Sequence, residues 1–96
     1  MTTAPYLSVV VPCYNESENL RRGVLQEMAD YLATLEQPHE VLVSDDGSTD
    51  DSRELVARYV AGQPSFRLLS NLHGGKPSAV WHGIQAALGD VVLFTD

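Results

Sequence analysis

The chain has 96 residues, of which 44% are hydrophobic and 20% are charged, as in an ordinary single globular domain. Thirteen acidic and six basic residues give a net charge of −7. This balance argues against a nucleic-acid or anionic-lipid partner, because both bind basic surfaces. A single cysteine excludes an internal disulfide, and no apolar run reaches the ~20 residues that span a bilayer. The polar N-terminus has no signal-peptide pattern, so we expect a cytoplasmic protein.

Apolar, strand-like segments alternate with amphipathic helical patterns along the whole chain. In chain order we predict strand 7–12, helix 17–36, strand 40–44, helix 51–61, strand 66–69, helix 77–88 and strand 91–94. This alternation is typical of an α/β fold with a doubly wound, parallel, Rossmann-like sheet. We predict the spatial strand order 3-2-1-4. Because the sequence stops directly after an apolar run, we expect it to be a piece of a longer domain.

Polar segments follow all four predicted strands at the end where such sheets bind ligands. They are Pro-Cys-Tyr-Asn-Glu at 12–16, Asp-Asp at 45–46, His-Gly-Gly-Lys at 73–76 and Thr-Asp at 95–96. The carboxyl ends of parallel strands share one edge of the sheet, so we expect these segments to converge there.

Four aspartates lie within seven residues, at 45, 46, 50 and 51. Asp50 and Asp51 suit the start of the second helix, where carboxylates cap or match the helix dipole. Asp45 and Asp46 instead end a core strand, where two like charges repel unless donors or a cation compensate them. A nucleobase imino N–H, a ribose hydroxyl or a metal could each do so, and the residues alone do not choose between them.

Two familiar nucleotide fingerprints are missing. No G-x-G-x-x-G follows the first strand, and no G-x-x-x-x-G-K-[ST] is present. Lys76 lies at a predicted helix N-terminus, where anions are favoured, so it is either a phosphate contact or a solvated lysine. The histidines lack metal-ligand spacing, and His73 is a candidate contact at the rim of a pocket. Cys13 is interpreted as a small buried residue, and Trp81 as a core or domain-interface residue.

Four motifs together carry a family resemblance: residues 10–16, residues 43–50, Gly75-Lys76 with Gly83, and Phe-Thr-Asp at 94–96. They resemble the family 2 inverting glycosyltransferases of the GT-A fold, in particular the polyprenyl- and dolichyl-phosphate sugar synthases. The pairing of P-x-Y-N-E with D-D-G-S-T-D makes the resemblance specific, and it covers essentially the whole chain. It implies that residues 1–96 are the truncated, nucleotide-sugar-binding N-terminal part of a single GT-A domain.

The resemblance also implies roles for individual residues. The implied nucleotide-binding residues are Pro12, Tyr14, Glu16, Asp45, Asp46, Lys76 and Asp96. Of the adjacent acids, Asp46 is the stronger candidate for recognition of the base, and Lys76 would approach the phosphates. Asp96 would be the first acid of a D-x-D motif, near the ribose and a Mg²⁺ or Mn²⁺ ion. No catalytic residue is expected within the chain.

The implied reaction is transfer of a hexose from a UDP- or GDP-sugar to an acceptor, with inversion. The acceptor class suggested by the synthases is a polyprenyl phosphate, which would place the whole protein at the cytoplasmic face of a membrane. The alternative is that the 96-residue chain only binds a nucleotide, or is a folding unit that self-associates through its last strand. A response-regulator receiver is a rival fold, but its adjacent acids follow the first strand.

Overall fold

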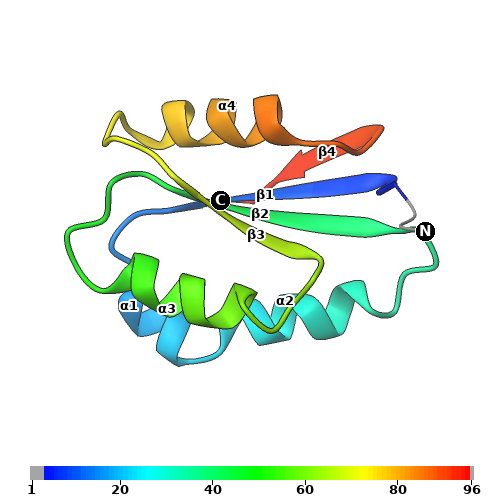
Figure 1. Ribbon diagram of the computed structural model, residues 1–96, viewed down its shortest axis with the longest axis horizontal. Coiled ribbons are helices and arrows are strands. Elements are labelled where there is room, and N and C mark those ends of the chain that lie inside the picture. Colours follow the sequence, from blue (N-terminus) through cyan, green and yellow to red (C-terminus); the bar gives the residue numbers. More distant parts are fainter. Residues whose placement is uncertain (1–3, 96) are drawn as a thin grey trace.

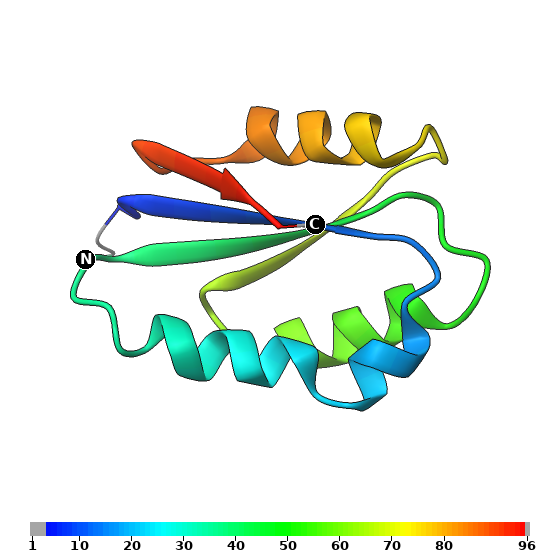
Figure 2. The same ribbon diagram turned by 180° about the vertical axis from the view of Figure 1, so that it is seen from behind.

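The computed structural model describes residues 4–95, which form one sheet with helices on both faces (Figures 1 and 2). In chain order the elements are β1 (Leu7–Cys13), α1 (Ser17–Arg21), α2 (Val24–Leu32), β2 (His39–Asp45), α3 (Ser52–Val60), β3 (Phe66–Ser70), α4 (Lys76–Ala86) and β4 (Val91–Phe94). The strands are parallel and lie in the order β3-β2-β1-β4, as predicted. Helix α4 covers one face, and α1, α2 and α3 cover the other.

The core forms around the two central strands because their side chains are covered on both faces of the sheet. Val10 on β1 and Val41, Leu42 and Val43 on β2 have no exposed surface. Continuous burial explains why these strands read as unbroken apolar runs and not as alternating ones. Because all four strands are parallel, their carboxyl ends lie at one edge of the sheet, at the left of Figure 1.

The single helix predicted over residues 17–36 is wrong, because the chain forms two helices there. Gly23 separates them with a φ of 89°, in the left-handed region that a right-handed helix cannot continue through. The break lets α1 follow the loop after β1, while α2 places Leu25 and Leu32 in the core. Apolar spacing persists on both sides of the break, so periodicity alone does not reveal it.

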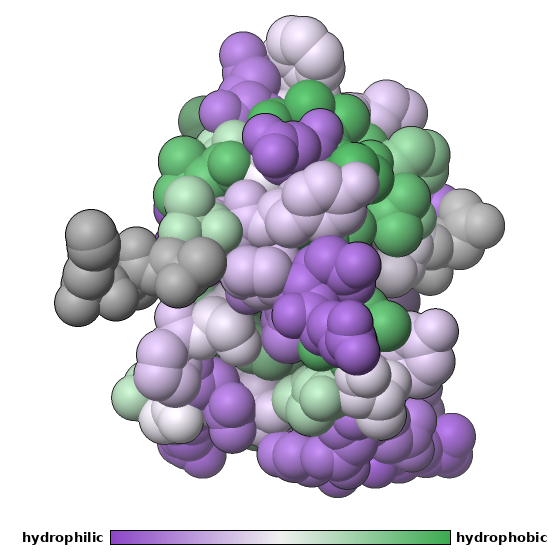
Figure 3. Space-filling view, turned by 90° about the vertical axis from the view of Figure 1, so that its right-hand side faces the viewer, coloured by the Kyte–Doolittle hydropathy of each residue, from purple (hydrophilic) through white to green (hydrophobic). Residues whose placement is uncertain are grey.

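The surface over α4 and β4 is more apolar than the rest. Figure 3 views the sheet from the end opposite the strands' carboxyl ends, and hydrophobic surface gathers in its upper part. Trp81 and Leu88 are 57% and 68% exposed, and Leu93 and Phe94 on β4 are 53% and 57% exposed. Trp81 therefore lies on the surface and is not part of the core. Within residues 4–95, no helix combines the length and apolarity needed to cross a bilayer.

A buried carboxylate ties the strands together at the edge opposite the polar loops. Glu40 accepts hydrogen bonds from the Ser8 hydroxyl at 2.6 Å, the Leu88 N–H at 2.7 Å and Arg67 at 3.1 Å. Burial by itself would raise the pKa of Glu40, but these three donors outweigh it and hold the pKa below its ordinary value of 4.5. The network links β1, β2 and β3 to the segment between α4 and β4.

We expect Glu40→Gln to destabilise the fold at neutral pH and to weaken its acid sensitivity. A carboxyl whose pKa is lower in the folded state stabilises the fold above its unfolded pKa, and this contribution is lost as the pH falls through the folded value. The stability difference between wild type and variant should therefore shrink as the pH falls below 4.5, through the lower pKa of the folded state. Urea unfolding followed by circular dichroism measures it, and a difference that stays constant with pH would contradict the assignment.

Candidate functional site

Asn15 joins the loop after β1 to the loop after β2. Its backbone lies in the left-handed region, with a φ of 50°. Its N–H donates to the Ser48 hydroxyl at 3.0 Å, and its side-chain oxygen accepts the N–H groups of Thr49 at 2.8 Å and Asp50 at 3.3 Å. The Asn15 side chain thus organises the loop after β2. Both residues that flank Asn15 are thereby fixed in position.

Asp45 is the last residue of β2, and it is buried. It has no exposed surface, and its carboxylate accepts the Ser48 N–H at 2.9 Å and the Ser48 hydroxyl at 2.6 Å. The guanidinium of Arg53 lies 3.7 Å away. The predicted nucleotide contact of Asp45 is not supported by this geometry, because the carboxylate faces its own loop and has no surface to offer a ligand.

Asp46 points the other way, toward the loop before α4. Its carboxylate accepts the N–H groups of Gly74 at 2.9 Å and Gly75 at 3.0 Å, and Nδ1 of His73 lies 2.8 Å from Oδ2. Burial alone would raise the pKa of Asp46, but these donors outweigh it and hold the pKa below its ordinary value of 3.8. Asp46 is therefore ionised at neutral pH, and its carboxylate lies at the N-terminal end of α4, where the helix favours an anion.

Helix α3 shows what the remaining aspartates do. Asp50 accepts the N–H of Ser52 at 2.9 Å, which is the capping role predicted for it. Asp51 forms an ion pair with Arg21 of α1, and its side chain makes no capping bond. Both therefore serve the packing of the helices and not the pocket.

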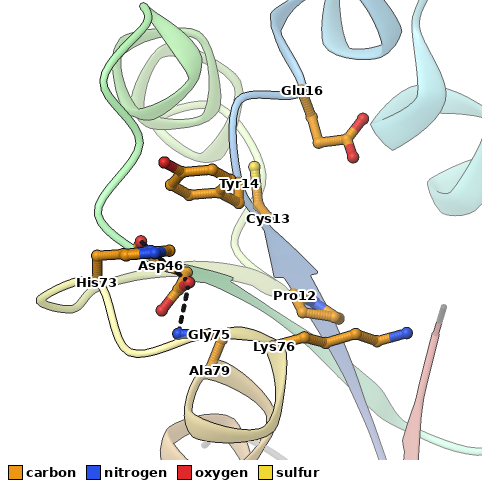
Figure 4. A pocket seen from close by; sticks show the side chains of 9 residues that line it. All are labelled: Pro12, Cys13, Tyr14, Glu16, Asp46, His73, Gly75, Lys76 and Ala79. Atoms are coloured by element: carbon orange, nitrogen blue, oxygen red, sulfur yellow. Dashed lines mark hydrogen bonds and ion pairs between the residues drawn. The ribbon is translucent and has the colours of Figure 1, made fainter.

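A hollow of about 260 Å³ opens between these loops at the carboxyl ends of the strands. Its lining comes from β1 and the following loop, the residue after β2, and the start of α4: Pro12, Cys13, Tyr14, Glu16, Asp46, His73, Gly75, Lys76 and Ala79 (Figure 4). Of the seven predicted residues, five line it, Asp45 does not, and Asp96 lies outside the described residues. In Figure 4 the amine of Lys76 and the carboxylate of Asp46 lie toward opposite sides of the hollow.

Aromatic and thiol groups form the wall near Asp46. The rings of Tyr14 and His73 stack with centroids 4.6 Å apart and planes 30° from parallel. Burial, together with the nearby charge of Asp45, raises the pKa of the Cys13 thiol to about 12. Cys13 is thus buried, as predicted, and stays protonated, so it supplies surface and not a nucleophile.

Sequence reasoning missed the glycine pair that holds Asp46. The sequence analysis places Gly74 and Gly75 in a polar segment before a helix and assigns them no contact, yet their N–H groups are what Asp46 binds. The available signal was an acid at the end of one strand and a glycine pair before a helix. The Asp46 carboxylate meets the two glycine N–H groups because α4 begins beside the end of β2. The strand order alone does not specify this position of α4.

The described residues do not form a metal site of their own. Between residues 4 and 95, no group of three or more His, Cys, Asp or Glu side chains could hold a metal ion. Asp46 already receives its donors from His73, Gly74 and Gly75. The predicted contact with Mg²⁺ or Mn²⁺ therefore rests on Asp96 alone, outside this range.

A sequence model described as glycosyl transferase family 2 matches residues 8–96, nearly the whole chain. The chain belongs to glycosyl transferase family 2. Among curated relatives of this family 2 chain, the dolichyl-phosphate beta-glucosyltransferase of Trichomonas vaginalis is 35% identical over 97 residues, covering 95% of the chain and 30% of that protein. The undecaprenyl-phosphate 4-deoxy-4-formamido-L-arabinose transferase of Aeromonas hydrophila is 36% identical over 97 residues, covering 99% of the chain and 29% of that protein. The chain thus spans less than a third of the length of these relatives.

Solved glycosyltransferases share the fold. The mannosyltransferase PcManGT from Pyrobaculum calidifontis, solved in complex with GDP-Man and Mn²⁺, matches with a TM-score of 0.72 at 29% identity. The match covers 95% of this family 2 chain and 27% of PcManGT. S. aureus TarS 1-349 matches with a TM-score of 0.73 at 29% identity, over 95% of this chain and 27% of that TarS 1-349 chain. The predicted family and the predicted GT-A type of fold are confirmed.

Proposed function

We propose that residues 1–96 are the nucleotide-sugar-binding N-terminal part of a GT-A domain in a family 2 glycosyltransferase. The whole protein would transfer a hexose from a UDP- or GDP-sugar to an acceptor. The observation that carries the proposal is the hollow at the carboxyl edge of the sheet, with an ionised Asp46 on one side and the amine of Lys76 on the other. A nucleoside diphosphate has a matching polarity, with hydrogen-bond donors on the base and negative charge on the phosphates.

Asp46 would select the base. Uracil and guanine both carry an imino N–H that an ionised carboxylate can accept, whereas cytosine and adenine have a lone pair at the corresponding ring nitrogen. An Asp46 carboxylate, with a pKa held below its ordinary value, remains an acceptor throughout the neutral range. The ring of Tyr14, which is 42% exposed, offers an apolar face against which a base can pack.

Lys76 would contact the diphosphate. We expect Lys76→Gln to weaken UDP binding by about tenfold, the effect of losing one charge-assisted contact. Binding of uridine, which has no phosphate, should be unchanged. Calorimetric titration of both ligands measures the difference, and an equal loss for uridine and UDP would contradict a phosphate contact.

The acceptor, the cation and the setting are proposed for the whole protein. Two relatives are named for dolichyl and undecaprenyl phosphate, which supports a polyprenyl phosphate acceptor at the cytoplasmic face of a membrane. The bound Mn²⁺ of PcManGT supports a divalent cation, Mg²⁺ or Mn²⁺, with Asp96 as one ligand. The described residues supply no step through this cation, and none of them is proposed as catalytic.

The test is calorimetric titration of this chain with UDP, GDP, CDP and ADP, with circular dichroism as the control for folding. We expect UDP or GDP to bind at millimolar concentration or below, and CDP and ADP to bind more weakly. A folded chain that binds neither UDP nor GDP at millimolar concentration would overturn the proposal.

The exposed edge of β4 favours self-association of the isolated chain. Leu93 and Phe94 are more than half exposed on a strand whose outer edge is unpaired among residues 4–95. Such an edge can pair with a second copy, so we propose self-association at high concentration. Light scattering that gives the mass of a monomer at all concentrations would contradict it.

A further inference from the structure

The carboxylate of Asp46 has already accepted most of the hydrogen bonds that it can accept. Oδ1 receives the Gly74 N–H at 2.9 Å, Oδ2 receives the Gly75 N–H at 3.0 Å, and Nδ1 of His73 lies 2.8 Å from Oδ2. A carboxylate has about four acceptor positions, two on each oxygen. The Gly75 N–H and the adjacent His73 nitrogen leave no room for another donor at Oδ2, so Asp46 can accept one further hydrogen bond, on Oδ1.

The proton position on His73 follows from its neighbours. Nδ1 lies 3.0 Å from the main-chain oxygen of Asp46 and 2.8 Å from Oδ2. Both are acceptors without a hydrogen, so Nδ1 must carry the proton in either charge state of the ring. His73 thus always donates to Asp46 in this arrangement.

His73 is also held in place by two further contacts. Its ring stacks on Tyr14, with centroids 4.6 Å apart. Its backbone nitrogen would lie 2.7 Å from a Cβ at Gly47, so the two loops approach as closely as only a glycine allows. The His73 backbone is therefore held beside Gly47, and its imidazole, 59% exposed, lies against Tyr14 at the rim of the pocket.

We propose that His73 makes this pocket selective for uracil over guanine, by occupying the carboxylate oxygen of Asp46 that guanine would need. Uracil presents one imino N–H between two carbonyl groups, which matches the single position left on Oδ1. Guanine presents an imino N–H and an amino N–H side by side, and a carboxylate accepts such a pair only with both oxygens. The inference rests on the proposed nucleotide-binding function and names the donor as a UDP-sugar.

The experiment compares the affinities of UDP and GDP for wild type and two variants of His73. His73→Phe keeps a ring against Tyr14 and a wall of similar shape, but it removes the donor to Asp46. His73→Asn keeps an N–H donor attached at the same position as Nδ1, but it removes the ring. The ratio of the two affinities is the readout, because a purely structural loss would weaken both nucleotides together.

We expect wild type to bind UDP about tenfold or more tighter than GDP, the effect of one unmatched hydrogen-bonding group. His73→Phe should bring this ratio close to one by strengthening GDP binding, and His73→Asn should retain the preference for UDP. The inference would be overturned if wild type bound UDP and GDP equally or preferred GDP. It would also be overturned if a folded His73→Phe variant kept the wild-type ratio of the two affinities. Each of these results would leave nucleotide binding itself intact. Failure of wild type to bind either nucleotide would instead refute the underlying function.

Discussion

Asp46→Asn is expected to reduce the affinity for UDP by about tenfold to a hundredfold, the range for loss of a hydrogen bond to a charged group. The substitution removes the charge and turns one acceptor oxygen into an N–H₂ group. That group would face the N–H of Gly74 or Gly75, donor against donor, so the loop before α4 should also loosen. Calorimetry with UDP measures the affinity, and circular dichroism checks the fold.

The matched control for this variant is Asp51→Asn. Asp51 lies in the same acidic segment, but it pairs with Arg21 and does not line the pocket. We expect its UDP affinity to equal that of wild type. A folded Asp46→Asn variant with wild-type affinity would show that the base is recognised elsewhere.

The second large effect is expected for stability, at the contact between α4 and β1. A Cβ on Gly83 would lie 2.3 Å from Cγ1 of Val10, a side chain with no exposed surface. Neither backbone can retreat without disturbing the core, so Gly83→Ala should lower the free energy of unfolding by about 1–3 kcal/mol. This loss is expected even though alanine favours helix over glycine by about 1 kcal/mol.

Gly62→Ala provides the comparison for that substitution. Gly62 follows α3, and a Cβ there would meet no atom within 4 Å. Urea denaturation of both variants should therefore give a large loss for Gly83→Ala and a change near zero for Gly62→Ala. Equal stabilities of the two variants would mean that α4 does not pack on β1 at Gly83.

The order of the strands and the edge that carries the site could be predicted from the sequence. Continuous apolar runs mark strands buried on both faces, and their alternation with helices leaves few topologies. Because all carboxyl ends then share an edge, the motifs at Pro12, Tyr14, Glu16, Asp46 and Lys76 could be placed in one pocket before any coordinates were known.

The orientation of the two adjacent acids could not be predicted. Asp45 and Asp46 are the same residue type at consecutive positions, and the local pattern is the same for both. Their roles separate because Ser48 satisfies one carboxylate within the loop, whereas the glycines before α4 satisfy the other. That separation depends on contacts between segments distant in sequence.

The break at Gly23 escaped prediction for a different reason. A glycine inside a helical pattern is tolerated at a modest energetic cost, so its presence alone does not end a helix. The left-handed turn at Gly23 redirects the chain so that α2 can bury Leu25 and Leu32 in the core. Tertiary contacts thus decide the local backbone.

The most direct test of the Asp46 pocket is a titration of the ¹⁵N-labelled chain with UDP, followed by two-dimensional NMR. The amides of His73, Gly74 and Gly75 report on the carboxylate that is proposed to bind the base. We expect these signals to shift saturably, together with those of Tyr14 and Lys76, while amides around Glu40 at the opposite edge stay unchanged. Saturable shifts confined to the opposite edge, or no shifts at millimolar UDP, would contradict a nucleotide site at Asp46.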